Sequence, residues 1–226
     1  MCPDEEFDPD NSNLVVGPIN KPRWIYSVSK QLMDRIIHAY GMKGELDYTL
    51  FRPFNWIGAG LDSLTASNPG GARVITQFLG HIIRGEPIQL VDGGAARRSF
   101  TDVDDAIRAL MTIIDNPNNI ASGKIYNIGN PSNNHSIREL AETLLKLSSS
   151  YEEYQAGAAR TKIVETSSGD YYGKGYQDVP NRTPKISNTV AELKWQPSVT
   201  LAGALKKILE ESRAEARTML ATPPAR

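Results

Sequence analysis

Residues 26–30 read Tyr-Ser-Val-Ser-Lys, and the interpretation of the whole chain starts from this stretch. It places the phenol of Tyr26 and the ammonium group of Lys30 four residues apart. Residues with this separation share one helix face, so both groups can approach the same substrate hydroxyl. A nearby cation favours a phenolate and lowers the pKa of a tyrosine, which makes it a usable base near neutral pH. The same spacing also fits a surface helix with an exposed lysine and a packed tyrosine.

The surrounding sequence alternates helical and strand-like patterns. Apolar residues recur at helical spacing from Ile25 to Tyr40, and residues 48–53 are β-rich and end at a proline. Asp102 can cap one helix, and Ser136 with Glu139 forms the capping box of another. This alternation predicts the α/β class. The further expected elements are helices over 72–84 and from Leu201, short strands at 87–91, 99–100 and 124–128, and an irregular region over 148–186 with one strand near Ile163.

Composition excludes several classes of function. The 226 residues are 40% hydrophobic and carry 25 basic against 26 acidic side chains, so no basic field argues for nucleic acid. Cys2 is the single cysteine, which excludes an intrachain disulfide and favours a reducing compartment. No apolar run approaches the roughly 20 residues of a membrane span, and the three histidines lack metal-ligand spacing. A soluble cytoplasmic protein without a metal site is expected.

The sequence lacks a complete dinucleotide-binding turn. Gly58-Ala59-Gly60 follows a strand, but Ser63 stands where the third glycine of G-x-G-x-x-G belongs, and Gly173-Lys174-Gly175 fails in the same way. Residues 1–70 also offer only one convincing β–α unit, whereas a doubly wound sheet needs several. The chain is therefore expected to be the second half of a larger fold.

Four stretches carry a resemblance to a known family. They are residues 21–31 around the Tyr26–Lys30 pair, 50–56, 92–102 and 171–179. Together they resemble the extended short-chain dehydrogenase/reductase family, whose members modify nucleotide sugars using NAD. Within it, they look like the UDP-glucuronic acid decarboxylase domain of ArnA-type polymyxin-resistance proteins. The similarity covers nearly all of residues 1–210.

The resemblance implies the C-terminal part of a Rossmann-like α/β fold, with the N-terminal dinucleotide-binding half absent. That half, and a Ser/Thr and a Glu of the active site, would lie upstream of Met1. Residues 1–211 would form the partial domain, with a small α+β lobe for a UDP-sugar mainly from 55–100 and 129–211. Residues 212–226 are expected to be a disordered tail. Family members assemble as homo-oligomers, so a homo-oligomer is expected for the full-length protein.

The resemblance also implies roles for residues on the cofactor side. Tyr26 matches the base that takes the proton of the sugar 4-hydroxyl. Lys30 matches the lysine that binds the nicotinamide ribose and holds the phenolate, and Pro53 matches a residue beside the nicotinamide. As a strand terminator, Pro53 has an equally good ordinary role.

Further residues match the substrate side. Arg182 matches the arginine assigned to protonation, although an arginine pKa above about 12 makes orientation or charge stabilisation an equally sensible role. Asn55 matches a contact to the UDP-sugar, Arg73 and Arg98 match contacts to the diphosphate and uridine, and Tyr176 matches a binding tyrosine. Gln89 stands where close relatives carry lysine, which weakens a charge-based role. Taken one at a time, these residues also have ordinary explanations. Asn55 fits a turn former, Arg73 and Arg98 fit solvated charges, and Tyr176 fits the packing of its loop.

The resulting expectation is NAD-dependent oxidative decarboxylation of UDP-glucuronic acid to a UDP-4-keto-pentose. This reaction belongs to lipid A modification with 4-amino-4-deoxy-arabinose, which gives polymyxin resistance. Two alternatives remain: another UDP-sugar enzyme of this fold, such as a 4-epimerase or a UDP-xylose synthase, or a non-catalytic remnant. Without its first half, the sheet would keep an uncovered apolar face. The isolated chain is therefore expected to be inactive, to bind NAD weakly and to aggregate.

Overall fold

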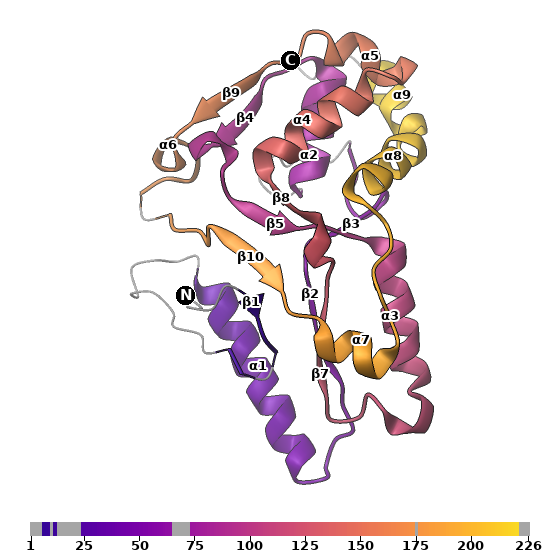
Figure 1. The fold of residues 1–226 in the computed structure, drawn as a ribbon. Coiled ribbons are helices and arrows are strands. Elements are labelled where there is room, and N and C mark those ends of the chain that lie inside the picture. The colour runs from indigo at the N-terminus through magenta and orange to yellow at the C-terminus, as the bar shows by residue number, and fades with distance from the viewer. Residues whose placement is uncertain (1–5, 10, 13–23, 65–72, 175, 222–226) are drawn as a thin grey trace. The chain divides into compact units, whose positions relative to one another are not determined.

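The computed structural model describes residues 6–9, 11–12, 24–64, 73–174 and 176–221 (Figure 1). The chain divides into two compact units. The first unit comprises residues 1–56, 96–134 and 168–198, and the second comprises residues 57–95, 135–167 and 199–226. The α/β class is confirmed. Of the residues expected in the UDP-sugar lobe, 57–95, 135–167 and 199–211 lie in the second unit, whereas 55–56, 96–100, 129–134 and 168–198 lie in the first.

Parallel strand pairs organise the first unit. Strand β10 (Asn181–Pro184) lies between β1 (Glu6–Phe7) and β5 (Arg97–Ser99), while β2 (Leu50–Pro53) pairs with β7 (Ile125–Ile128). Parallel pairing of short strands connected by helices is the pattern of α/β proteins. The helices of this unit are α1 (Trp24–Met42), α3 (Val103–Asp115), α6 (Ser168–Tyr172) and α7 (Ser187–Leu193), and β6 spans Thr101–Asp102.

The core of the first unit forms where α3 meets β7 and the segment after α7. Asp102 caps α3 as expected, because its side chain accepts a hydrogen bond from the backbone N–H of Asp104 at 3.0 Å. The helix buries alanines, whereas its larger apolar residues Ile107 and Ile114 are 48% and 71% exposed. The buried core residues are Ala106, Ala109, Ala121, Tyr126, Ile128, Leu193 and Trp195.

Helix α1 confirms the helical spacing around the Tyr26–Lys30 pair. Asp34 on the helix accepts a hydrogen bond from Arg52 of β2 at 3.2 Å, which links these two elements. The helix nevertheless has no buried residue. Its exposed apolar side chains are Ile25, Tyr26, Val28, Leu32, Met33, Ile36, Tyr40 and Met42.

The second unit packs helices around one parallel strand pair. Strand β4 (Ile88–Val91) pairs with β9 (Ile163–Thr166), and Ser136 with Glu139 forms the expected capping box of α4. The helices are α2 (Val74–Arg84), α4 (Ile137–Ser148), α5 (Glu152–Ala158), α8 (Leu201–Glu211) and α9 (Arg213–Ala221). Strands β3 (Trp56–Ile57) and β8 (Asn134–Ser136) lie where the chain passes between the units, and short 3-10 helices span 92–94, 117–119 and 131–133.

Two sequence expectations are wrong. Residues 148–186 contain α5, α6 and β10 in addition to the one strand expected there. Residues 213–221 form α9, where a disordered tail was expected. Helix α5 depends on a close approach to α2, because a Cβ on Gly157 would collide with the carbonyl oxygen of Ile82. Such long-range contacts leave no local pattern in the sequence.

A buried carboxylate holds α9. The side chain of Glu153 on α5 is 4% exposed and accepts hydrogen bonds from Arg213 and Arg217 of α9, each at 2.9 Å from Nε. A hydrogen bond with its own backbone, reinforced by these two guanidinium groups, lowers the pKa of Glu153 to about 2. A carboxyl whose folded pKa is depressed stabilises the folded state above its ordinary pKa. That contribution is lost as the pH falls toward the folded pKa.

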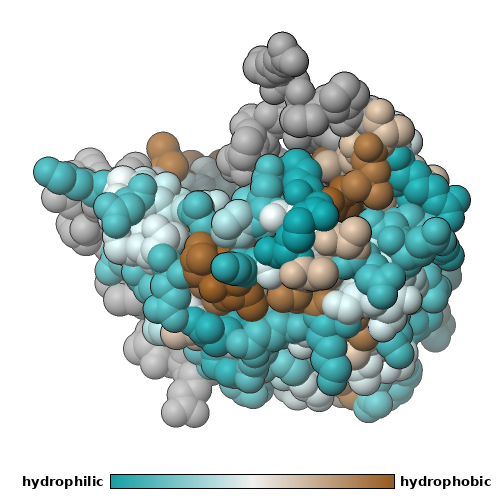
Figure 2. All heavy atoms as spheres, turned by 90° about the horizontal axis from the view of Figure 1, so that it is seen from above, coloured by the Kyte–Doolittle hydropathy of each residue, from teal (hydrophilic) through white to brown (hydrophobic). Residues whose placement is uncertain are grey.

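Within the described residues, no helix combines the length and the apolar character that crossing a bilayer requires. On the face shown in Figure 2, most residues are hydrophilic and the hydrophobic ones form smaller groups among them.

A tight bend follows β2. Asn55 has φ of 42°, in the left-handed region that residues with a Cβ rarely adopt. Its side-chain Nδ2 donates a hydrogen bond to the carbonyl of Ser99 at 3.2 Å, and its own carbonyl accepts one from the backbone of Thr101 at 3.1 Å. Asparagine tolerates this conformation through its short polar side chain. The bend therefore ties the end of β2 to the strand region 99–101.

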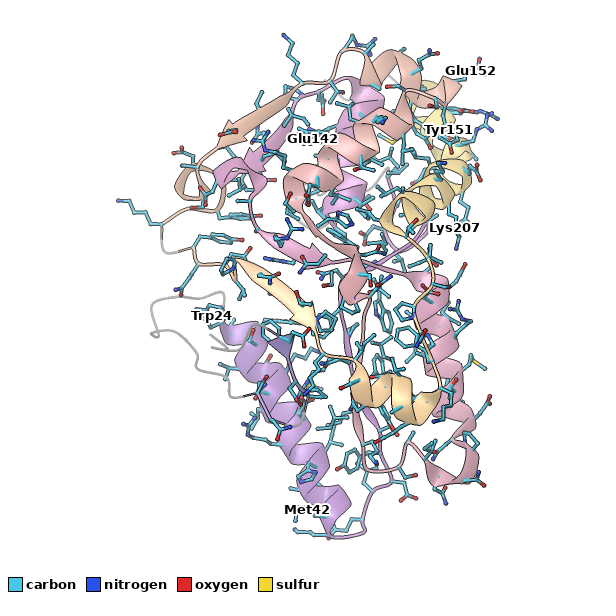
Figure 3. All side chains as sticks on the ribbon, viewed as in Figure 1. Trp24, Met42, Glu142, Tyr151, Glu152 and Lys207 are labelled. Atoms are coloured by element: carbon cyan, nitrogen blue, oxygen red, sulfur yellow. The ribbon has the colours of Figure 1, made fainter. Side chains whose placement is uncertain are left out.

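We expect Glu153→Gln to loosen α9, because the two arginines lose a charged acceptor. Amide hydrogen exchange over residues 213–221 should become faster than in the wild type at neutral pH. Lowering the pH from about 4.3 toward 2 should lower the protection factors of these amides, which are corrected for the intrinsic pH dependence of exchange, more in the wild type than in the variant. Glu152→Gln, at the exposed neighbouring position (Figure 3), is the matched control. Equal exchange in Glu153→Gln and the wild type would contradict this account.

We expect Asn55→Ala to destabilise the protein more than Asn55→Gly. Both variants lose the hydrogen bond to Ser99, but only alanine carries the penalty of about 1 kcal/mol for the left-handed conformation. Urea unfolding of the two variants measures the difference. A lower midpoint for the glycine variant would show that this bend is not what determines the choice of asparagine.

Candidate functional site

The Tyr26–Lys30 pair lies exposed on α1. The Nζ atom of Lys30 is 5.7 Å from the centre of the Tyr26 ring, so the four-residue spacing brings the two groups together as predicted. Tyr26 is 68% exposed, and the alternative of a packed tyrosine is therefore wrong. Ser29 donates a hydrogen bond to the Tyr26 carbonyl at 2.8 Å, within the same turns. Both reactive heads are accessible to a hydroxyl arriving from solvent.

The segment 176–179 lies against the start of α1. Trp24, the first residue of α1 and at the opposite end from Met42 (Figure 3), donates its indole N–H to Oε1 of Gln177 at 2.9 Å. The hydroxyl of Tyr176 donates to Oδ2 of Asp178 at 3.2 Å, and the Tyr176 ring stacks on Tyr172 at 3.9 Å. Tyr176, the predicted binding tyrosine, is therefore fixed at its hydroxyl by Asp178 and at its ring by Tyr172.

Arg98 is engaged inside the first unit. The residue is 8% exposed, and its guanidinium donates to Oδ2 of Asp178 at 2.7 Å and to the carbonyl of Val179 at 2.9 Å. It also donates to the carbonyl of Arg97 at 2.7 Å. In the parallel pairing of β5 with β10, Arg98 is the register partner of Arg182. The two arginines predicted to serve the substrate therefore lie beside each other on neighbouring strands.

Asn55 and Pro53 lie at the end of β2. Pro53 is exposed and pairs in register with Ile128 of β7. Asn55 contacts Ser99, which directly follows Arg98 on β5. Hydrogen bonds between nearby elements therefore connect the bend after β2, the arginine strand, the segment 176–179 and the start of α1.

Arg73 and Gln89 belong to the second unit. Arg73 directly precedes α2, its side chain is exposed, and its backbone N–H donates to Oδ2 of Asp62 at 2.9 Å. Gln89 is exposed on β4, opposite Val164 of β9. The other predicted site residues, Tyr26, Lys30, Pro53, Asn55, Arg98, Tyr176 and Arg182, belong to the first unit.

The sequence did not single out the residues that connect this site. Trp24, Gln177 and Asp178 stand inside the motifs that carry the resemblance, but their hydrogen bonds join residues as far as 153 positions apart. A sequence pattern reports local periodicity and gives no indication of such pairs. The motif 171–179 itself was the available signal.

Comparison with known proteins places the chain in a family. The sequence model described as the NAD dependent epimerase/dehydratase family matches residues 1–129, more than half of the chain. The PbgP3 protein from Burkholderia pseudomallei has a similar structure, with a TM-score of 0.84 and 57% identity, over 96% of this chain and 61% of that chain. The chain thus spans about three fifths of that relative's length.

More distant solved structures share the fold. A dTDP-glucose 4,6-dehydratase from Bacillus anthracis in complex with NAD has a TM-score of 0.69 at 18% identity, over 95% of this chain and 58% of its own. A UDP-glucuronic acid 4-epimerase from Bacillus cereus, in complex with UDP-glucuronic acid and NAD, has a TM-score of 0.63 at 19% identity, over 86% and 52%. At these identities the likeness concerns the fold alone. On the family match, this chain belongs to the NAD dependent epimerase/dehydratase family, an enzyme family whose cofactor is NAD.

Proposed function

We propose that this chain serves the NAD-dependent oxidative decarboxylation of UDP-glucuronic acid to a UDP-4-keto-pentose. The observation that carries the proposal is the exposed Tyr26–Lys30 pair on α1. A hydrogen bond between Trp24 and Gln177 joins this helix to the segment 176–179, which is in turn hydrogen-bonded to Arg98. The resemblance of the motifs at 21–31 and 171–179 to those of the decarboxylase supports this choice among nucleotide-sugar enzymes. The proposed setting is cytoplasmic lipid A modification and polymyxin resistance, with the full-length protein acting as a homo-oligomer.

Tyr26 and Lys30 perform the first chemical task. Tyr26 accepts the proton of the sugar 4-hydroxyl as the general base, and the Lys30 ammonium group binds the nicotinamide ribose. Bound NAD supplies the oxidising power at C4 of the sugar. Pro53, exposed at the end of β2, lies beside the nicotinamide in this proposal. The side chains of Tyr26, Lys30 and Pro53 are all exposed, so each of them is open to contact with a bound cofactor.

The second task follows from the structure of the oxidised sugar. A ketone at C4 makes the compound a β-keto acid, because the carboxylate carbon C6 is attached to C5. Loss of CO2 leaves the electron pair of the C5–C6 bond as an enolate across C5, C4 and the C4 oxygen, and protonation at C5 restores the C4 ketone. Arg182 orients the carboxylate and stabilises the enolate charge, because a group with a pKa above about 12 is a poor proton donor. A nearby water or another side chain is then the proton source.

The remaining predicted residues bind the nucleotide sugar. The exposed Arg73 side chain suits the diphosphate, since a guanidinium fork pairs with phosphate oxygens. Asn55 and Gln89 provide uncharged contacts, and Tyr176 offers an aromatic face and a hydroxyl.

Two other functions remain to be distinguished. A UDP-sugar 4-epimerase uses the same Tyr–Lys pair but returns the hydride to C4, so neither NADH nor CO2 accumulates. A UDP-xylose synthase releases CO2 but restores NAD by reducing the ketone. A non-catalytic remnant consumes no UDP-glucuronic acid at all. NADH that accumulates in step with substrate consumption is therefore specific to the proposed reaction.

We expect Tyr26→Phe to abolish NADH formation and leave UDP-sugar binding intact. The test protein joins this sequence to the part of the PbgP3 chain that the sequence does not cover. Loss of the base should lower the rate of NADH formation by about 100-fold or more. Tyr40→Phe, at an exposed tyrosine of the same helix, is the matched control and should keep its activity. Unchanged turnover in Tyr26→Phe would reject the assigned base.

We expect Arg182→Met to weaken binding of UDP-glucuronic acid about tenfold or more, as loss of a charge-assisted hydrogen bond does. Binding of UDP-glucose, which lacks the carboxylate, should change by less than about twofold. Calorimetric titration of both ligands measures the contrast. An equal loss for both sugars would assign Arg182 to the fold or to the nucleotide and not to the carboxylate.

The 226-residue chain alone is expected to bind NAD weakly, because its sequence lacks the glycine-rich turn that holds a pyrophosphate. Titration of the purified chain with NAD in a calorimeter tests this. Stoichiometric binding at micromolar concentration would contradict the expectation, and would assign the cofactor to residues other than those named above.

A further inference from the structure

We infer that Asp62 is a positioning residue, which fixes the arginine proposed to bind the diphosphate. Asp62 lies 11 positions before Arg73, and its Oδ2 atom accepts a hydrogen bond from the backbone N–H of Arg73 at 2.9 Å. Asp62 was not among the predicted site residues, and it acts through Arg73 without touching the ligand. The role of Arg73 toward a nucleotide sugar rests on the proposed function, whereas the contact between the two residues does not.

Arg73 is an unusual residue for the start of a helix. It occupies the N-cap of α2 with φ of −66° and ψ of 156°, and its own side chain makes no capping hydrogen bond. Serine, threonine, aspartate and asparagine are preferred at this position, because their side-chain oxygens accept from the N–H groups of the first turn. An arginine cannot accept such a bond, and it brings a positive charge to the positive end of the helix dipole. The local sequence therefore does not favour Arg73 here.

Asp62 supplies the acceptor that the local sequence lacks. The Oδ2 atom that binds the Arg73 N–H also accepts a hydrogen bond from the hydroxyl of Thr76 at 3.3 Å. Thr76 is the third residue of α2, the position from which a glutamate reaches back to the N-cap N–H in a capping box. The Asp62 carboxylate takes the place of that glutamate, and its negative charge is favourable at this end of the helix.

The contact with Asp62 determines where the Arg73 side chain starts. Burial of the apolar face of α2 holds the helix from Ile75 onward, whereas Arg73 precedes this face and is exposed. The backbone N–H of Arg73 donates to Asp62, and its carbonyl accepts from the N–H of Gln77 at 3.0 Å. Of these two bonds, the first fixes Arg73 from outside the helix.

The segment 62–64 is itself anchored in the second unit. Ser63 donates a side-chain hydrogen bond to Glu215 of α9, and Leu64 is buried. The buried carboxylate on α5 holds α9 in turn. Asp62 therefore relays a position that the packing of the unit determines, and the Arg73 side chain extends from a defined point. A guanidinium placed before the ligand arrives loses less conformational freedom when it binds a diphosphate.

Two effects of Asp62 on a bound diphosphate have opposite signs. Its negative charge repels phosphate groups, so removing the charge alone would tighten binding. Its hydrogen bond holds Arg73 in place, so removing the acceptor weakens binding through Arg73. Asp62→Asn removes the charge and keeps a side-chain oxygen that can accept, whereas Asp62→Ala removes both. The two variants together separate the hydrogen bond from the charge.

The first test needs no ligand and follows amide hydrogen exchange in the 226-residue chain. We expect Asp62→Ala to lower the protection factor of the Arg73 amide by about fivefold, the loss that one hydrogen bond of ordinary strength produces. The Gln77 amide, whose partner is the Arg73 carbonyl, should change in the same direction. Asp62→Asn should keep most of the protection. The amides of the buried residues Leu79 and Ile82 should keep theirs and confirm folding.

Glu211→Ala is the matched control for this measurement. It removes an exposed carboxylate at the end of α8, in the same unit as Asp62, and should leave the Arg73 amide unchanged. Wild-type protection of the Arg73 amide in Asp62→Ala would overturn the inference.

The second test measures UDP binding by calorimetry, with this sequence joined to the uncovered part of the PbgP3 chain. We expect Arg73→Ala to raise the dissociation constant of UDP about tenfold and Asp62→Ala about fivefold. Asp62→Asn should stay at or below the wild-type value. In the Arg73→Ala background, Asp62→Ala should not raise the dissociation constant further, because the residue through which Asp62 acts is gone.

The double variant decides how Asp62 acts. A fivefold loss that persists without the Arg73 side chain would assign Asp62 to the general stability of the unit and overturn the positioning role. Tighter binding in Asp62→Ala, or an unchanged dissociation constant in Arg73→Ala, would also overturn it. If the wild type does not bind UDP, the proposed function fails, and exchange of the Arg73 amide still decides whether Asp62 fixes this residue.

Discussion

The partly buried ion pair between Arg98 and Asp178 is the interaction on which the arrangement of the proposed site depends. Its two residues lie 80 positions apart, on β5 and on the segment that precedes β10. The parallel pairing of these strands then places Arg182 beside Arg98. Because the pair is largely removed from water, separating its partners would leave a charge without compensation. The site is therefore held by charge and backbone hydrogen bonds, whereas the Tyr26–Lys30 pair stays exposed on α1.

The sequence predicted those structural features whose stabilising contacts join residues only a few positions apart. The helical spacing of the Tyr26–Lys30 pair, the cap at Asp102 and the capping box at Ser136 are each complete within a few residues, and each is confirmed. Helix α9 was not predictable, because it depends on Glu153, which lies 60 positions before Arg213. Helix α5 was not predicted for a similar reason. Its Gly157 is required because the carbonyl oxygen of Ile82, far away in the sequence, leaves no room for a Cβ.

The sequence named candidate site residues one at a time, but gave no indication of their contacts with one another. The motif matches named Arg98 and Tyr176 separately, and the structure connects both to Asp178. The Arg98 guanidinium also donates to the carbonyls of Arg97 and Val179, and its role toward the nucleotide sugar stays a prediction. Arg73 and Gln89 lie in the other unit, and their roles stay predictions. A motif match indicates which residues are candidates for the site, whereas the role of each residue follows from its contacts.

The proposed chemistry requires that the carbon of the substrate carboxylate leave as CO2 and that the ketone at C4 persist. The most direct test supplies the extended protein with NAD and UDP-glucuronic acid labelled with carbon-13 at C6, and follows the label by NMR. The account predicts that the label appears as CO2 and bicarbonate while an unlabelled UDP-4-keto-pentose accumulates. Label that stays in a nucleotide sugar epimerised at C4 would contradict the account and identify an epimerase.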